Sequence, residues 1–252
     1  MKSVLITGGS EGIGLELARL FVQDNTRVIL AARNEERLAK VKRQLESCGR
    51  GEVLVFSADL TVPEERQALY EAVKDLDIDV LVNNAGIGFA GPVGHTGIED
   101  DLRLIRLNDE AVVHLCKLFV SDMIARREGM IINMASTGAF QPGPYIASYY
   151  ASKAFVVNYT EALAYETRSY GLKVHAYCPG PVDTAFYPKS KGVKPPFAVT
   201  PVKAAEYLYT HLNDRRIVLV PGVLNKVMRI MPKWIKVPVL AEMKRSNGGW
   251  KK

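Results

Sequence analysis

Short apolar segments alternate with longer amphipathic segments along most of the chain, which predicts a repeated strand–helix order. Each expected strand is three or four residues long and almost entirely apolar, as a parallel sheet buried on both faces requires. The expected strands cover residues 4–6, 28–31, 53–56, 80–82, 130–132, 174–177 and 217–220.

Segments with helical periodicity lie between these strands. Asn34 is suited to cap the second helix, and Pro63 suits the first turn of the third. The expected helices cover residues 13–22, 35–46, a stretch after Pro63, 98–127, 149–170 and 202–212. Strands joined by such helices form right-handed crossovers. The sequence therefore predicts an α/β fold: a single-domain Rossmann-type doubly wound parallel sheet of about seven strands with helices on both faces.

A glycine-rich turn, Thr7–Gly14, follows the first strand and leads into the first helix. Glycines at positions 8, 12 and 14 let the backbone turn tightly and approach a pyrophosphate without a Cβ in the way. The helix that begins here directs N–H groups and a positive dipole end at the phosphates. We interpret the turn as a phosphate site for a dinucleotide; the alternative is a plain tight turn.

The second strand ends without the acidic residue that binds the ribose 2′-OH of NAD. Arg33 stands there instead, and a guanidinium is suited to bind a phosphate. Because a cation just before a helix N-terminus is electrostatically disfavoured, a surface arginine is the weaker alternative. The position predicts the 2′-phosphate of NADP(H).

Charge is distributed unevenly along the 252 residues, whose net charge is +6. Residues 225–252 hold eight basic residues and one acidic residue, a net charge of +7, which leaves −1 for the rest. A body of that charge argues against nucleic acid as a partner. The three cysteines and four histidines have no metal-site spacing, so we expect no metal and reduced cysteines.

The chain resembles the short-chain dehydrogenase/reductase family over about residues 3–222. Its motifs occur here in order as Thr7–Gly14, Asp59-Leu60, Asn83-Asn84-Ala85-Gly86, Ser136, Tyr149-x3-Lys153, and Pro179-Gly180 with Thr184. The resemblance implies an NADP(H)-dependent oxidoreductase that interconverts a ketone and a secondary alcohol, with Asn108, Ser136, Tyr149 and Lys153 as catalytic residues. It implies that the cofactor is bound by Gly8, Ser10, Glu11, Gly12, Ile13, Gly14, Arg33, Asp59, Leu60, Asn84, Ala85, Gly86, Tyr149, Lys153, Pro179, Gly180, Val182 and Thr184.

The chemistry of the residues supports this role. Tyr149 and Lys153 are four apart on a predicted helix, so both project from one face. A phenol has a pKa of about 10, and a nearby ammonium group lowers that pKa by favouring the phenolate. A hydroxyl at Ser136 would stabilise charge on the substrate oxygen, and by the resemblance Asn108 supports a water and proton relay.

Each of these residues also has a structural alternative. Tyr149 and its neighbour Tyr150 could be packing residues, and Ser136 could only end a strand. Asn108 could hydrogen-bond inside its long helix, and Asp59 could belong to the turn that begins the third helix.

The remaining segments bear on the substrate and partners. Residues 181–200 match the family's variable substrate loop, and the aromatic side chains of Phe140, Tyr145, Phe186, Tyr187 and Phe197 suggest an apolar pocket mouth. We expect a bulky lipophilic carbonyl or alcohol, such as a steroid or fatty-acyl compound, because residues 135–144 resemble hydroxysteroid dehydrogenases and ketoacyl reductases. The alternatives are a 3-ketoacyl carrier-protein reductase and a noncatalytic NADP-sensing interaction protein.

We divide the chain into a dinucleotide-binding and catalytic domain, residues 1–222, and a basic amphipathic tail, residues 223–252, which Pro232 and Pro238 should break into short pieces. The tail could pack on another subunit or close over the substrate, lie on an anionic membrane surface, or remain solvated. The resemblance implies a homodimer or homotetramer. A cytoplasmic location is expected because the first strand begins within three residues of Met1 and no apolar run reaches about 18 residues.

Overall fold

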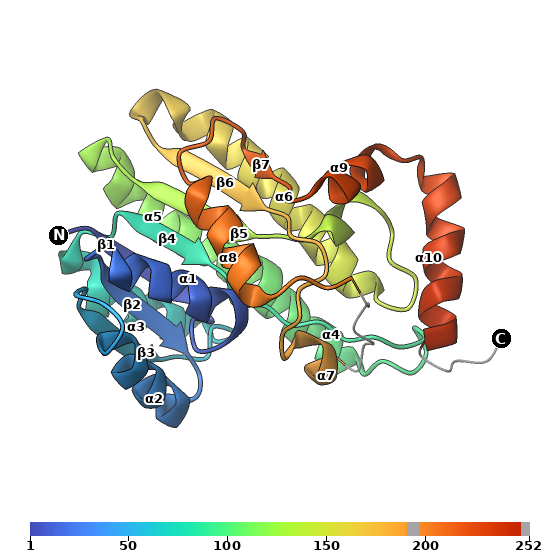
Figure 1. Cartoon of the computed structure of the whole chain (residues 1–252), viewed down its shortest axis with the longest axis horizontal. Coiled ribbons are helices and arrows are strands. Elements are labelled where there is room, and N and C mark those ends of the chain that lie inside the picture. Colours follow the sequence, from blue (N-terminus) through green and yellow to red (C-terminus); the bar gives the residue numbers. More distant parts are fainter. Residues whose placement is uncertain (191–196, 248–252) are drawn as a thin grey trace.

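Seven parallel strands form one sheet in this computed structural model, which describes residues 1–190 and 197–247 (Figure 1). The strands lie in the order β3-β2-β1-β4-β5-β6-β7, so the order reverses between β1 and β4. Their bounds are β1 Ser3–Thr7, β2 Arg27–Ala32, β3 Val53–Ser57, β4 Val80–Asn83, β5 Met130–Met134, β6 Lys173–Tyr177 and β7 Val218–Leu219. The predicted fold class and the seven predicted strands are confirmed.

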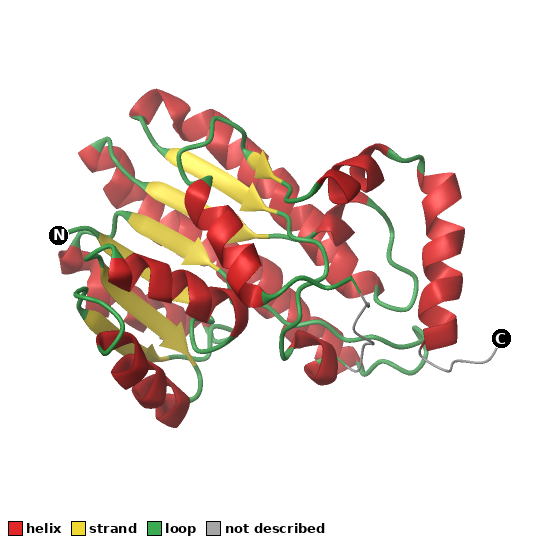
Figure 2. Ribbon diagram, viewed as in Figure 1, coloured by secondary structure: helices red, strands yellow, loops and turns green. Residues whose placement is uncertain are grey.

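Helices cover both faces of the sheet (Figure 2). Their bounds are α1 Gly12–Gln23, α2 Glu35–Glu46, α3 Pro63–Val73, α4 Ile98–Ile105, α5 Ala111–Arg126, α6 Ala147–Thr167, α7 Phe186–Lys189, α8 Pro201–Thr210, α9 Val223–Ile230 and α10 Lys233–Asn247. Successive strand residues point to opposite faces, so Leu5 and Ile6 of β1 enter two different cores. Helices α3, α5 and α6 complete one core, and α1, α2 and α8 complete the other.

Local sequence signals place the helix ends. The Asn34 side chain accepts a hydrogen bond from the Arg37 N–H at 2.7 Å, which confirms it as the cap of α2 and stabilises the helix by about 1 kcal/mol. The single helix predicted over residues 98–127 is interrupted. A π-helical turn, Arg106–Glu110, separates α4 from α5. The sequence did not indicate this turn, because residues on both sides of it have the apolar spacing of an α-helix.

The C-terminal segment differs from the expected short pieces. Pro232 separates α9 from α10, but α10 continues through Pro238. The expected break at Pro238 is wrong, because a proline removes one backbone hydrogen bond without preventing helix on both sides of it. The carbonyl that loses its partner belongs to Trp234, which is exposed, so water can replace the lost donor.

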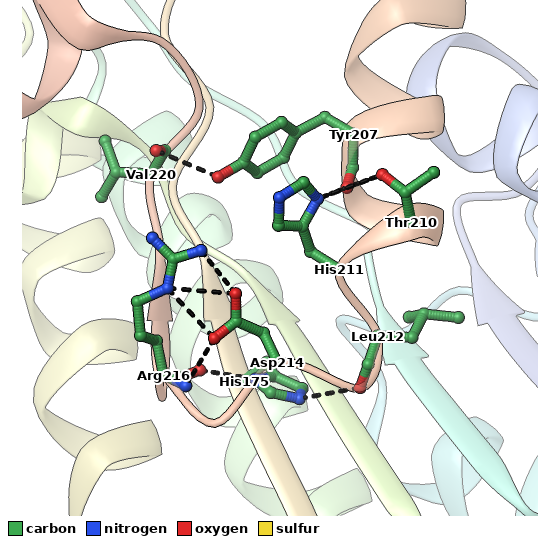
Figure 3. A network of polar contacts seen from close by, with 8 residues as sticks. All are labelled: His175, Tyr207, Thr210, His211, Leu212, Asp214, Arg216 and Val220. Atoms are coloured by element: carbon green, nitrogen blue, oxygen red, sulfur yellow. Dashed lines mark hydrogen bonds and ion pairs between the residues drawn. The ribbon is translucent and has the colours of Figure 1, made fainter.

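The short edge strand β7 is held by a polar network between its preceding loop and β6 (Figure 3). The His175 ring is buried, and its two nitrogens lie 2.9 Å from the Arg216 carbonyl oxygen and 3.2 Å from that of Leu212. Burial lowers the pKa of His175. Within the loop, the Arg216 guanidinium pairs with the Asp214 carboxylate. These contacts fix the loop that leads into β7 and then into α9.

Two further features concern the described residues as a whole. Their helices are all too short or too polar to cross a membrane. Groups of three or more His, Cys, Asp or Glu side chains that could hold a metal ion do not occur among them either. The three cysteines carry free thiols.

Candidate active site

The loops after β1 and β4 are locked together where the strand order reverses. The Thr7 hydroxyl accepts hydrogen bonds from the Asn84 and Ala85 N–H groups, both at 3.0 Å. The Asn84 side-chain amide donates in return to the carbonyls of Thr7 and Gly8, at 2.9 and 3.1 Å. Parallel sheets bind ligands at such a reversal, at the carboxyl ends of the strands. Two of the sequence motifs therefore meet where a ligand is expected.

The glycines of the loop after β1 leave space that the Cβ atom of any other residue would occupy. Gly8 and Gly12 have φ of +64° and +60°, which glycine adopts without strain. A Cβ on Gly14 would lie 2.5 Å from the Asn84 amide and 2.8 Å from the Gly8 carbonyl. Helix α1 begins at Gly12, and its N-cap Glu11 makes no side-chain bond to the first turn. The first N–H groups of α1 can thus bind an anion, which fits the pyrophosphate of a dinucleotide.

Arg33 lies at the exposed ends of β2 and β3, beside Asp59. Its guanidinium is 3.9 Å from the Asp59 carboxylate, and its side chain is 51% exposed. That carboxylate also accepts from the N–H and hydroxyl of Thr61, at 3.0 and 2.8 Å. Asp59 therefore does form the turn that precedes α3. Arg33 itself is loosely paired and can approach a phosphate.

Glu11 has a set of ion pairs that sequence reasoning missed. Its carboxylate pairs with both Arg37 of α2 and Lys189 of α7. It thereby ties the glycine-rich loop to the helix after Arg33 and to the expected substrate loop. Arg37 lies in the first turn of α2, four positions after Arg33, which is a usable signal. Nothing in the sequence places Lys189, 178 residues away, beside Glu11.

Lys153 is a buried cation one turn after Tyr149 on α6. Its ammonium donates a hydrogen bond to the Met134 carbonyl at the end of β5, at 2.7 Å, and only 5% of the residue is exposed. The same Nζ lies 5.7 Å from the centre of the Tyr149 ring. The structure thus brings these two predicted residues together, and it places the cation where it favours a phenolate.

Lys153 interacts electrostatically with a half-buried group, Asp109, which no sequence motif indicated. Burial lowers the pKa of Lys153 to about 8, and the negative charge of Asp109 acts in the opposite direction. Burial raises the pKa of Asp109 to about 6, while Lys153 opposes that shift. The Oδ1 atom of Asp109 is buried and has no hydrogen-bond partner among the described residues. At neutral pH both groups are mostly charged, and each stabilises the charge of the other.

Asn108 sits in the π-helical turn and is fully buried. Its amide donates to the Ile87 carbonyl at 2.9 Å and to the Ser152 hydroxyl at 3.1 Å, and its oxygen accepts from the Ile87 N–H at 3.0 Å. The side chain therefore joins the wide turn to the loop after β4 and to α6. Its contacts lie between elements, not within its own helix as the structural alternative supposed.

Ser136 is the second residue after β5 and caps a short 3₁₀ turn, Thr137–Phe140. Its Oγ accepts from the Gly138 N–H at 3.1 Å. Because the oxygen accepts in this bond, the hydroxyl hydrogen is not used there and can be directed to a ligand. The Thr137 N–H bonds to the Pro179 carbonyl at 3.0 Å, so this turn is held against the loop after β6.

Aromatic rings surround the half-buried side chain of Tyr149. The ring centres of Phe186 and Tyr150 lie 5.0 and 6.1 Å from that of Tyr149. Gly88 packs closely against two of these rings, since a Cβ there would lie 3.0 Å from Tyr149 and 2.6 Å from Phe186. Phe186 is therefore at the site, as expected for a residue of the substrate loop.

The other four aromatic residues expected at the pocket mouth lie in different surroundings. Phe140 lies beneath the Arg229 guanidinium of α9, 4.8 Å away, and Tyr145 has a positive φ of 63° in the loop before α6. Phe197 is exposed, and the Tyr187 side chain lies outside what the structure describes. The pocket mouth predicted from these five residues is thus supported directly by Phe186 alone.

The last group of predicted cofactor residues follows β6. A Cβ on Gly12 would lie 3.3 Å from the Thr184 methyl group, so Thr184 faces the glycine-rich loop. Val182 bridges to Val199, which joins the two ends of the predicted substrate loop. A Cβ on Gly180 would lie 2.6 Å from the Asn225 side chain of α9, a contact the sequence did not signal. The remaining predicted positions are Ser10 in the glycine-rich loop, Ile13 in the first turn of α1, Leu60 in the turn before α3, and Pro179 in the loop after β6.

A doubly wound sheet with these motifs defines a nucleotide-binding oxidoreductase fold. The model of the short chain dehydrogenase family matches residues 2–192. The chain is 30% identical to 17-beta-hydroxysteroid dehydrogenase type 3 of Danio rerio, over 93% of this chain and 78% of that one.

Two solved structures are similar over most of their length. A short-chain dehydrogenase from Sphingobium yanoikuyae in complex with NADPH has a TM-score of 0.86 at 26% identity, covering 98% of this chain and 96% of that one. An actinorhodin polyketide ketoreductase with NADPH has a TM-score of 0.77 at 31% identity, covering 87% and 95%. The protein belongs to the short-chain dehydrogenase/reductase family, whose members act on hydroxyl and keto groups.

The close packing at Gly88 predicts a specific defect. In Gly88→Ala, the added methyl group would press on Tyr149 and Phe186, and both rings must move. We expect kcat to fall by about tenfold to a hundredfold, because misplacing a reacting group by about 1 Å has an effect of that size. The control is Gly94→Ala, where an added Cβ meets nothing within 4 Å. An unchanged kcat in Gly88→Ala would contradict this packing.

The coupling of Asp109 to Lys153 predicts a shift in pH dependence. Asp109 is ionised above its pKa of about 6 and raises the pKa of Lys153, so Asp109→Asn should lower the Lys153 pKa further below about 8. We expect the alkaline limb of the kcat/KM profile to move to lower pH. Glu99→Gln removes an exposed charge in the first turn of α4 and serves as the control. A limb that stays in place in Asp109→Asn would refute the coupling.

Proposed function

We propose that the protein is an NADP(H)-dependent oxidoreductase that interconverts a ketone and a secondary alcohol, with Tyr149 as its proton-transferring residue. The observation that carries the proposal is the buried Lys153 ammonium 5.7 Å from the Tyr149 ring. A cation held at this distance stabilises the phenolate form relative to the phenol. A packing tyrosine has no need of a desolvated cation beside it.

The chemistry divides among three side chains. The bound dinucleotide would supply or accept the hydride. During reduction, the Tyr149 hydroxyl gives its proton to the carbonyl oxygen, and during oxidation it takes a proton from the alcohol. Lys153 stabilises the resulting phenolate. The Ser136 hydroxyl donates a hydrogen bond to the substrate oxygen, where negative charge develops. The negative charge of Asp109 favours the charged form of Lys153, and Asn108 bonds to Ser152, the residue before Lys153 on α6.

The cofactor would be held by the two locked loops. The glycine-rich turn and the N-terminus of α1 would bind the pyrophosphate, and Gly86 leaves space beside Lys153 for the nucleoside, since a Cβ there would lie 3.4 Å from Nζ. Exposed Arg33 supports NADP(H), because a guanidinium binds a 2′-phosphate and no carboxylate ends β2. Both similar structures named above hold NADPH.

The substrate we propose is bulky and lipophilic, such as a steroid or fatty-acyl compound. The Phe186 ring packs against Tyr149 at a tilt of 47°, and half-buried Tyr150 lies on the same helix, so aromatic rings border the reacting group. The relative from Danio rerio is a hydroxysteroid dehydrogenase. The oligomeric state and cytoplasmic location expected from the sequence stay predictions.

A 3-ketoacyl carrier-protein reductase is the second candidate. The basic C-terminal segment would suit an acidic carrier, and a polyketide ketoreductase is among the similar structures. Turnover of free and carrier-linked substrates separates the two candidates. A noncatalytic NADP-sensing protein is less well supported, because Ser136, Tyr149 and Lys153 are all present.

Removing one hydroxyl tests the proton-transfer role. Tyr149→Phe keeps the ring against Phe186 but leaves no proton to transfer, so turnover should fall at least about a hundredfold. Binding of NADPH, followed by fluorescence titration, should stay largely intact. Tyr150→Phe removes a neighbouring hydroxyl from the same helix and should remain active. Near-normal turnover in Tyr149→Phe would overturn the mechanism.

Reversing one charge tests the cofactor choice. Arg33→Asp replaces the proposed phosphate ligand with a carboxylate, which repels the 2′-phosphate and can bind a ribose hydroxyl. The ratio of kcat/KM for NADPH to that for NADH should fall by about tenfold or more. Arg43→Asp makes the same charge change near the other end of α2 and should leave the ratio unchanged. The assignment fails if Arg33→Asp keeps the original preference.

A further inference from the structure

Helix α9 turns apolar side chains outward and polar side chains toward the body. Val223, Val227 and Ile230 lie along one stripe of the helix and are 77%, 47% and 81% exposed. On the other side, Asn225 meets Gly180, and the Arg229 guanidinium lies over the Phe140 ring. A helix on the surface of a water-soluble protein has the opposite arrangement.

Helix α10 repeats this reversal. Its side chains Trp234 and Val239 are 78% and 67% exposed. Two of its cations point inward instead. Lys236 is buried and donates to the carbonyls of Phe140 and Met228, at 3.1 and 2.9 Å. Further along, the Lys244 ammonium lies 5.2 Å from the centre of the Tyr150 ring. In both α9 and α10, the face toward solvent is therefore more apolar than the face toward the body of the protein.

Exposed apolar side chains are concentrated in this segment. Of nineteen large apolar residues that are exposed in the described part of the chain, eight lie between positions 223 and 243. Scattered single residues of this kind are normal on a protein surface, whereas a cluster marks an interaction site. The cluster stands at one end of the molecule, where α9 and α10 project beyond the carboxyl ends of the strands (Figure 1).

Positive charge accompanies the cluster. Lys226 and Lys233 are exposed beside the apolar stripe, and Glu242 pairs with Arg245. The C-terminal segment has a net charge of +7 and the rest of the chain −1. The electrostatic field of the molecule therefore orients the end that carries α9 and α10 toward a negatively charged surface.

We propose that the outer face of α9 and α10 docks on the surface of a membrane that contains anionic lipids. The exposed side chains, led by Ile230 and Trp234, would enter the boundary between headgroups and acyl chains. Lys226 and Lys233 would bind the lipid phosphates. Apolar and cationic groups interleaved on one exposed face are the combination that interfacial helices use.

A second copy of the chain fits this face less well. In a two-fold contact the same patch meets itself, so Lys226 and Lys233 of one copy would approach those of the other. Like charges in a contact that excludes water repel, and only one acidic residue lies in the segment. Anionic lipids supply the opposite charge and also take up the apolar residues.

Docking in this orientation would bring the candidate pocket to the membrane. The inner face of the two helices contacts Phe140 and Tyr150, which lie before and after the loop of residues 141–146. That loop joins the turn after Ser136 to α6, the helix that carries Tyr149. A lipophilic substrate could then pass from the bilayer to the site without crossing water. This consequence rests on the proposed function, but the docking itself does not.

Co-sedimentation of the full chain with vesicles tests the docking without any substrate. The chain should bind phosphatidylcholine vesicles that contain phosphatidylglycerol. The double variant Ile230→Asp with Trp234→Asp should lose affinity by about tenfold or more. Lys226→Glu with Lys233→Glu should lose about fivefold per cation on the anionic vesicles. Val93→Asp changes an equally exposed apolar residue outside the segment and should bind like the original chain.

Two results would overturn the proposal: no binding of the original chain to anionic vesicles, or undiminished binding of the Ile230 and Trp234 variant. A variant that binds vesicles normally but loses oligomer mass in light scattering would assign the face to a second copy instead. Thermal unfolding followed by circular dichroism verifies that each variant is folded. In a Trp250→Phe background, a blue shift of Trp234 emission with vesicles should accompany binding, and its absence would also count against the proposal.

Discussion

A charge-assisted hydrogen bond from the Lys153 ammonium to the Met134 carbonyl sets the position on which the candidate site depends. It joins α6 to the end of β5 and keeps a cation in a place where burial lowers its pKa to about 8. The negative charge of Asp109 acts against that shift, and the Tyr149 ring centre lies 5.7 Å from the ammonium. The helices and strands around the site hold Lys153, Asp109 and Tyr149 in this arrangement.

The sequence was most informative where one local cause decides the structure. Apolar runs located the strands to within one or two residues, since a buried parallel strand tolerates few other patterns. Asn34 and the glycines of the first loop indicated their own roles, because a cap and a positive φ are properties of single residues. The four-residue spacing placed Tyr149 and Lys153 on one face of a helix, while the resemblance to the family selected this pair.

Contacts between distant segments could not be predicted this way. Nothing local indicates that Lys189 pairs with Glu11, that Asn225 covers Gly180, or that Lys236 bonds to the Phe140 carbonyl. The prediction of a helix break at Pro238 was wrong because it used a local rule only. The placement of α10 also depends on tertiary contacts made by Lys236 and Lys244. Local signals fixed the elements, while packing decided how the C-terminal helices meet the site.

The π-helical turn at Arg106–Glu110 affects the whole helical segment formed by α4 and α5. One additional residue in a turn rotates everything after it by about 100° about the helix axis, given 3.6 residues per turn. The two halves therefore present differently oriented faces: α4 meets α6, and α5 meets α3 and the sheet. A substitution on α4 therefore acts on its contact with α6, the helix that carries Tyr149, while α5 keeps its contacts with α3 and the sheet. The wide turn thus separates the half that borders the helix of the candidate site from the half that packs in the core.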